Sequence, residues 1–197
     1  MKKEALKRAE ASIAIEGKAV SDMLPCIQGE SFAAAVDLIA GAKRVMTCAS
    51  GTSGVAAKKF AHSLCCIEVG AMFMPPCEAV HGGLGALQEG DVLIMISRGG
   101  KTAELLPIIS ACAGRKAKLI AITENNQSPL AEAADVVLPL FIERESDPYD
   151  MMATSSFVAT IALCDAMLVA LMEEMGYRKE QFAPIHPGGA VGARLNK

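Results

Sequence analysis

Three times along this chain, a short and continuously apolar run is followed by a turn of small or polar residues and then by helix-forming residues. The runs cover residues 45–48, 92–96 and 117–123, and a fourth apolar run follows at 136–141. Continuous apolar runs that alternate with helices are typical of parallel strands buried on both faces. The pattern therefore predicts a doubly wound α/β sheet, whose ligands bind beyond the carboxyl ends of the strands.

Helices are predicted on both sides of this core. Apolar spacing favours one helix from about Lys3 to Leu24, a second over ESFAAAVDLIAGAK that ends near Gly41, and a long, largely apolar one from Met151 to Met175. A helix that is apolar on most sides must be buried, so we expect the long helix to pack against a neighbouring subunit as well as its own sheet. We interpret the chain as a single domain with three parts: N-terminal helices (1–40), sheet core (41–142), and long helix with a His-Pro-Gly-Gly tail (143–197).

Composition excludes several classes of function. The net charge is −3 and no basic run occurs, which argues against a nucleic-acid partner. No uninterrupted apolar run reaches the ~18 residues of a membrane span, and no secretory signal is evident, so we expect a cytoplasmic protein. The seven cysteines include no C-x-x-C pair, so neither a disulfide framework nor a metal site is predicted. The 52% hydrophobic content, with few aromatics, favours a buried subunit interface.

Two short loops carry the candidate binding chemistry. SGTSG (50–54) and SRGGKT (97–102) each follow a strand and open a helix. Their hydroxyls, glycines and unpaired backbone N–H groups suit an anion, phosphate above all. The alternative is that the serines and threonines only cap helices. Neither loop has Walker A or G-x-G-x-x-G spacing, so no nucleotide cofactor is predicted.

These loops resemble the paired phosphosugar loops of SIS (sugar isomerase) domains. EAVHGGLGALQEGD, AITENNQSPLAEAADV, ATSSFVATIALCDAMLVAL and FAPIHPGGAVG are further similar to arabinose-5-phosphate isomerases of the KpsF/GutQ type, from about Arg44 to Leu195. The resemblance implies a flavodoxin-like three-layer sandwich with a mainly parallel five-stranded sheet. It also implies a homotetramer, or a homodimer, with sites shared between subunits and no cofactor. Members of the family often carry a C-terminal pair of CBS domains, and this sequence ends before such a pair would begin.

The resemblance places the substrate phosphate on the two loops and so implies these binding residues: Ser50, Gly51, Thr52, Ser53, Ser97, Arg98, Lys101 and Thr102. Four positions depart from the family, and one of them is Pro75, which replaces the histidine that precedes the family's Pro-Ala-Glu. Gly99 replaces a serine, Thr52 replaces the lysine of the first loop, and Lys101 replaces the glutamate of the second. Arg98 is either a replacement contact for the phosphate or a solvated side chain. Thr52 does match the Gly-Thr-Ser pattern in the isomerase half of glucosamine-6-phosphate synthase.

Aldose–ketose isomerisation needs a base, an acid and polarisation of the carbonyl. The catalytic candidates are Glu145, which follows the last strand and matches the family's glutamate before Cys-Pro, His186 in the tail, and His81. Glu145 could instead be a solvated loop acid, and His186 could cap its own helices. His81 could bind substrate hydroxyls or hold the oligomer, and His62 is interpreted as structural.

Three hypotheses about function follow. The first is a phosphosugar aldose–ketose isomerase, most similar to the arabinose-5-phosphate/ribulose-5-phosphate enzymes, with a hexulose 6-phosphate isomerase as a variant. The second is a module that binds a phosphosugar as a sensor without turnover, which the altered positions 52 and 101 favour. The third is an unrelated α/β ligand-binding protein.

Overall fold

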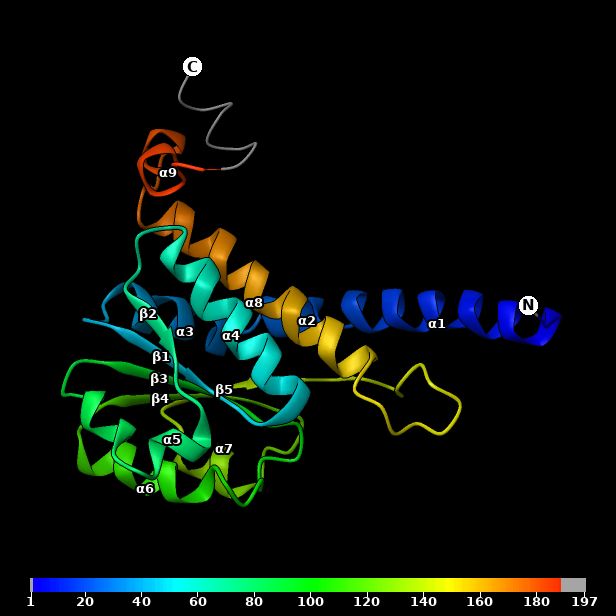
Figure 1. Cartoon of the computed structure of the whole chain (residues 1–197), viewed down its shortest axis with the longest axis horizontal. Helices are drawn as coiled ribbons and strands as arrows, with labels where there is room; N and C mark the ends of the chain where they lie inside the picture. Colours follow the sequence, from blue (N-terminus) through cyan, green and yellow to red (C-terminus); the bar gives the residue numbers. More distant parts are fainter. Residues whose placement is uncertain (1, 189–197) are drawn as a thin grey trace.

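The computed structural model describes residues 2–188 and forms a sheet between two layers of helices (Figure 1). The predicted tail after Gly188 lies outside the described residues. In chain order the elements are α1 (Lys3–Ser21), α2 (Leu24–Ile27), α3 (Glu30–Ala40), β1 (Val45–Cys48), α4 (Gly51–Cys65), β2 (Ala71–Phe73), α5 (Pro76–Ala79), the 3₁₀ helix η1 (Gly83–Ala86), β3 (Val92–Ile96), α6 (Leu106–Gly114), β4 (Lys118–Thr123), α7 (Pro129–Ala133), β5 (Val136–Pro139), α8 (Ser155–Glu174) and α9 (Lys179–Ile185).

The five strands are all parallel and lie in the order β2-β1-β3-β4-β5. This confirms the predicted doubly wound sheet. Helices α1, α3, α4 and α8 cover one face, and α5, α6 and α7 cover the other (Figure 1). The chain leaves β1 toward the first face and β3 toward the second, so the loops after these neighbouring strands diverge at a switch point. Ligands of open α/β sheets bind at such a point.

Strand β3 shows why the sheet could be predicted from the sequence. Val92, Ile94 and Ile96 belong to the core under α4 and α8, whereas Leu93 and Met95 belong to the core over α6. Side chains alternate between the faces of a strand, and here both faces are covered, so every position must be apolar. All five residues are at most 2% exposed.

The predicted long helix is present as α8, but it begins at Ser155 rather than Met151. The residues before it are drawn into a loop, because the Asp147 carboxylate accepts hydrogen bonds from the backbone N–H groups of Met151 and Met152 at 2.9 Å. By length and apolarity alone α8 could cross a membrane, with a hydropathy of 1.9. Within the chain it packs on α1, α3 and α4, and 44% of its most apolar stretch is buried there.

Two further local differences separate the structure from the sequence expectation. Strand β2 was not identified, because the apolar run at 71–74 is short and ends at Pro75, and the strand itself has only three residues, with Met72 at its centre 47% exposed. Helix α4 begins at Gly51 and not near Val55. Ser50 takes the extended backbone conformation of an N-cap residue, so the expected turn residues form the first helical turn.

Helix α4 approaches β1 closely at Gly54. A Cβ atom added there would lie 2.8 Å from the backbone oxygen of Ala49, which cannot move aside easily. We expect Gly54→Ala to lower the free energy of unfolding by about 1–3 kcal/mol through overpacking. The matched control is Gly17→Ala in α1, where nothing lies within 4 Å of the added carbon. Alanine should be neutral or stabilising there by up to about 1 kcal/mol, as measured by urea denaturation. Equal effects at both positions would contradict the close approach.

Candidate functional site

The first predicted loop forms the amino end of α4. Ser50 precedes the helix and its hydroxyl makes no capping hydrogen bond. Thr52 is exposed and Ser53 is half-buried, so both hydroxyls stand in the first turn. The first N–H groups of an α-helix have no intrahelical partner and carry the positive end of the helix dipole. The loop therefore offers hydroxyl and N–H donors together at one edge of the sheet.

The second loop, residues 97–102, is held in a tight turn by its own hydroxyls. Ser97 Oγ lies 2.9 Å from Thr102 Oγ1 and accepts a hydrogen bond from the backbone N–H of Gly100 at 3.1 Å. Gly100 has a φ of +66°, and a Cβ atom there would overlap Ser128 Oγ at 1.9 Å. Only glycine fits this position, so the loop is fixed against the start of α7. Lys101 is exposed, and its side chain makes no ion pair within residues 2–188.

Residues of both loops line one crevice between them, although Ser97 and Thr102 are not among those residues. Its walls combine Thr52 and Ser53 of the first loop, Arg98 of the second, and Ser156 and Thr160 of α8, among other residues. The crevice has room for about one water molecule, with a free volume of about 10 Å³, so a phosphate requires side chains to move. An open groove of about 420 Å³ lies on the other side of the first loop, where Ser50 and Gly51 line it.

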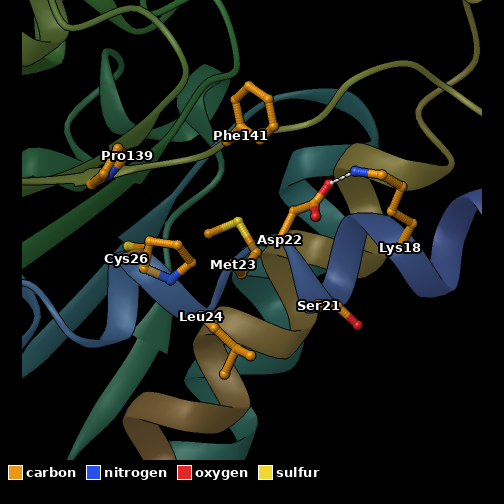
Figure 2. Close-up of a pocket in the computed structure, with 9 residues that line it drawn as sticks. Lys18, Ser21, Asp22, Met23, Leu24, Cys26, Pro139 and Phe141 are labelled. Carbon is orange, nitrogen blue, oxygen red and sulfur yellow. Dashed lines mark hydrogen bonds and ion pairs between the residues drawn. The ribbon is translucent and has the colours of Figure 1, made fainter.

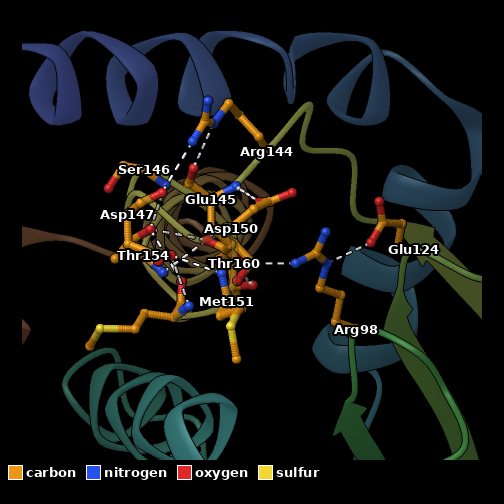
Figure 3. A network of polar contacts seen from close by, with 12 residues as sticks. Arg98, Glu124, Arg144, Glu145, Ser146, Asp147, Asp150, Met151, Thr154 and Thr160 are labelled. Carbon is orange, nitrogen blue, oxygen red and sulfur yellow. Dashed lines mark hydrogen bonds and ion pairs between the residues drawn. The ribbon is translucent and has the colours of Figure 1, made fainter.

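Arg98 connects this crevice to two carboxylates (Figure 3). Its Nε donates to Glu124 Oε2 at 2.6 Å, and its Nη1 donates to Glu145 Oε1 at 2.9 Å. The Glu145 side chain is only 2% exposed, whereas the Arg98 side chain is 40% exposed. Arg98 is therefore a partly accessible cation whose position is set by one buried and one half-exposed anion. It is not a freely solvated side chain.

The second oxygen of Glu145 holds the start of α8. Glu145 Oε2 accepts hydrogen bonds from the backbone N–H of Thr154 at 2.9 Å, from Thr154 Oγ1 at 3.1 Å and from the N–H of Ser156 at 3.1 Å. Burial raises the pKa of Glu145, but hydrogen bonds from Ser156 and Thr154 outweigh it, and the pKa stays below its usual range. Glu145 is thus an ionised, buried carboxylate, not a solvated loop acid.

The loop that carries Glu145 is itself well anchored. The Ser146 hydroxyl lies 2.8 Å from Ser12 Oγ and donates to Glu16 Oε1 at 2.8 Å, so α1 braces the loop. The Glu145 N–H donates to Asp150 Oδ1 at 2.5 Å, and Arg144 donates to the backbone oxygen of Glu145 (Figure 3). These contacts place the carboxylate at the ligand edge of the sheet.

The structure does not bring the two predicted histidines to this crevice within one chain. His186 stacks on Phe182, and its Nδ1 lies 3.0 Å from the Phe182 backbone oxygen in α9. Helix α9 lies beyond the carboxyl end of α8 (Figure 1), and α8 has 20 residues, so roughly 30 Å of helix separates His186 from Glu145. His81 follows α5 and is exposed. Neither histidine lines the crevice.

Sequence reasoning missed three residues of the site: Glu124, Thr154 and Ser156. The polar run before the apolar stretch of α8 was a usable signal for the last two, because serine and threonine at a helix start mark a capped terminus. Glu124 follows β4 within AITENNQSPLAEAADV, a stretch that resembled the family without giving this residue a role, so only its contact with Arg98 identifies it.

A larger cavity of about 640 Å³ lies away from both loops (Figure 2). Leu24 and Phe141 line it with other apolar side chains, and the ion pair of Lys18 with Asp22 stands at its rim. None of the predicted site residues reaches it.

Comparisons with known proteins identify the family of the chain. Residues 38–170 match the SIS domain family. The chain is 38% identical to the arabinose 5-phosphate isomerase KdsD of Pseudomonas aeruginosa, over 95% of this chain and 57% of the relative. The chain thus spans little more than half the length of the curated relatives it matches.

Two solved structures are similar over nearly the whole chain. One is a Listeria monocytogenes protein proposed to be a sugar-phosphate isomerase, with 45% identity, a TM-score of 0.91, and coverage of 95% of this chain and 100% of that one. The other is an Escherichia coli CFT073 protein solved in complex with A5P, with 27% identity, a TM-score of 0.87, and the same coverage of both chains.

The role of Glu145 as an ionised cap is testable by substitution. In Glu145→Gln the amide N–H₂ group faces the N–H donors of α8, and Arg98 loses a charged partner. We expect a loss of about 2–3 kcal/mol in the free energy of unfolding at pH 7. The control, Glu143→Gln, changes an exposed carboxylate two residues away that is 3.5 Å from Lys18, and should cost less than about 0.5 kcal/mol.

The pH dependence has a defined sign. Because folding lowers the pKa of Glu145, its stabilisation is present above about pH 4.3, the unfolded value, and is lost as the pH falls toward the folded value. Urea denaturation should therefore show the difference between wild type and Glu145→Gln shrinking as the pH falls below about 4.3. A difference that stays constant with pH would contradict an ionised cap.

Proposed function

The chain belongs to the SIS domain family, and on that premise we propose that it is a phosphosugar aldose–ketose isomerase that interconverts arabinose 5-phosphate and ribulose 5-phosphate. One observation carries the proposal: Thr52 and Ser53 of the first loop and Arg98 of the second line one crevice, next to an ionised, buried carboxylate. The relatives named arabinose 5-phosphate isomerase, and the neighbour bound to A5P, support the choice of sugar.

In this proposal the loops bind the phosphate. Ser53 and the N–H groups of the first turn of α4 donate from one side, and Ser97 and Thr102 donate from the other. Ser97 and Thr102 bond to each other in the free protein, so a phosphate oxygen replaces that mutual contact. Arg98 adds a charge-assisted hydrogen bond. Ser50, Gly51, Thr52 and Lys101 complete the binding set that the family resemblance implies.

Isomerisation moves one proton between neighbouring carbons. A base removes the proton from C2 of the aldose, the electron pair forms the C1–C2 double bond, and the π pair of the C1 carbonyl moves to O1 to give an enediolate. A proton then returns at C1 while O1 gains a proton and O2 loses its own, so that the C2 carbonyl of the ketose forms. We assign these transfers, with ring opening, to Glu145, His186 and His81. Glu145 can take a proton only when one of its oxygens gains access to the substrate, because donors occupy both in the free protein. Neither cofactor nor metal is required.

The histidines reach a site only if subunits share it. We propose a homotetramer, or a homodimer, in which His186 of one copy lies at the crevice of another. Only 44% of the most apolar stretch of α8 is buried within the chain, and Val169 on its surface is 66% exposed. An apolar face of this kind suits a helix of a second copy. We place the protein in the cytoplasm, with neither nucleic acid nor membrane as a partner.

A second candidate function is a phosphosugar sensor without turnover. The lowered pKa of Glu145 favours it, since a carboxylate held by four donors is a weak base. Thr52 and Lys101, which replace the family's lysine and glutamate, point the same way. Isomerisation of another sugar, such as a hexulose 6-phosphate, is a variant of the first candidate.

Hydrogen exchange separates the two candidates. We incubate the protein in heavy water with a panel of pentose and hexose phosphates and follow deuterium at the carbon next to the carbonyl by NMR. Turnover predicts exchange with arabinose 5-phosphate, lost by at least about 100-fold in Glu145→Gln or His186→Ala if each carries a proton. Binding of a sugar phosphate from the panel without deuterium exchange would contradict the isomerase proposal and support the sensor. Each variant is first checked for its thermal unfolding.

Shared sites predict complementation between inactive variants. Neither Glu145→Gln nor His186→Ala is active alone in this proposal, but one copy of each can build one intact site. Random reassembly of an equal mixture should recover about a quarter of the wild-type activity, because a site needs both intact partners. No recovery, from a mixture that sedimentation shows to be hetero-oligomeric, would place Glu145 and His186 in separate roles.

A further inference from the structure

Glu124 is a charged residue at the ligand edge that neither the sequence motifs nor the proposed chemistry uses. It follows β4, and it meets Arg98 at two points. The Glu124 N–H donates to the Arg98 backbone oxygen at 3.0 Å, and the Glu124 carboxylate accepts from Arg98 Nε at 2.6 Å. Thr123 Oγ1 also donates to the Arg98 backbone oxygen at 3.0 Å. The loop after β4 therefore fixes both the backbone and the side chain of Arg98.

The placement of Arg98 matters because of the charges around the crevice. Glu145 is ionised and buried behind Arg98 and Ser156, which line the crevice, and a phosphate dianion that enters would be repelled by this carboxylate. The guanidinium lies between the carboxylates of Glu124 and Glu145 (Figure 3), and Arg98 lines the crevice with Ser53. A cation at this point compensates the repulsion and adds directed donors.

Arg98 can serve both carboxylates and a ligand at once. A guanidinium has five N–H donors, and the hydrogen bonds to Glu124 and Glu145 use one on Nε and one on Nη1. Within residues 2–188 its Nη2 donates to no protein acceptor. Without Glu124, the Arg98 guanidinium could rotate and donate to the Glu145 carboxylate through two of its nitrogens, because arginine–carboxylate pairs favour this bidentate geometry. Glu124 opposes this rotation because its carboxylate accepts the hydrogen bond from Arg98 Nε.

We infer that Glu124 is a positioning residue, which holds the Arg98 guanidinium in the crevice wall as the cation that binds the anionic group of the substrate. The inference rests on the proposed function. Glu124 itself touches no substrate and moves no proton. Its effect passes entirely through Arg98, so it should alter ligand affinity more than the rate of the chemical step.

A double-mutant cycle tests this dependence. Glu124→Ala, Arg98→Ala and the double variant are compared for the dissociation constants of arabinose 5-phosphate and inorganic phosphate by calorimetry. For active variants, KM and kcat are measured as well. We expect Glu124→Ala to weaken both ligands and to raise KM about tenfold, with kcat changed less than about threefold. In the Arg98→Ala background the same substitution should have no further effect. Glu124→Gln, which keeps an acceptor oxygen, should lie between wild type and Glu124→Ala.

Glu132→Ala is the matched control, since Glu132 is an exposed carboxylate on neighbouring α7 with no ion pair in the described part of the chain. It should leave both dissociation constants unchanged. If Glu124→Ala does not fold, Glu124→Gln takes its place in the double-mutant cycle. Unchanged affinity in Glu124→Ala, or an equal loss in the Arg98→Ala background, would overturn the inference alone. A wild-type protein that neither binds nor turns over any phosphosugar would overturn the proposed function as well.

Discussion

The buried carboxylate of Glu145 joins its own loop to the start of α8 and to Arg98, which is 47 residues away in sequence. One oxygen accepts from Arg98 after β3, and the other accepts from Thr154 and Ser156 at the start of α8. A buried charge that loses its partners costs several kcal/mol, so the loop, the helix start and the arginine must be in place together. Because α8 also packs on α1, α3 and α4, one ion pair links the helical layer to the ligand edge of the sheet.

The same contacts bear on the chemistry. Donors that keep a carboxylate ionised also make it a weaker base, so stability of the α8 start and basicity of Glu145 oppose each other. A bound phosphosugar could shift this balance by competing for Arg98 or by moving residues of the closed crevice. The isomerase and the sensor therefore differ in one physical property, which is whether an oxygen of Glu145 becomes free when the ligand binds.

Some features of the site could be predicted from single residues and others could not. The loops at 50–54 and 97–102 were identified because serine, threonine and glycine after an apolar run have a local meaning. Glu145 was identified as a candidate from its place after the last strand and its family match. The ion pairs of Arg98 with Glu124 and Glu145 join residues 26 and 47 positions apart, which no local pattern encodes. The role of Glu145 as a helix cap depends on Thr154 and Ser156, which are 9 and 11 residues away and carry no signal for this acceptor.

The sequence by itself determined the parallel sheet and the two anion-binding loops, because burial on both faces forces unbroken apolar strands and tight turns demand small residues. Tertiary structure alone decided that Arg98 lies between two carboxylates, that α8 starts four residues later than its apolar pattern suggests, and that His186 ends at the opposite end of α8. Those outcomes depend on hydrogen bonds between side chains and backbone that meet only after the sheet and its helices have packed.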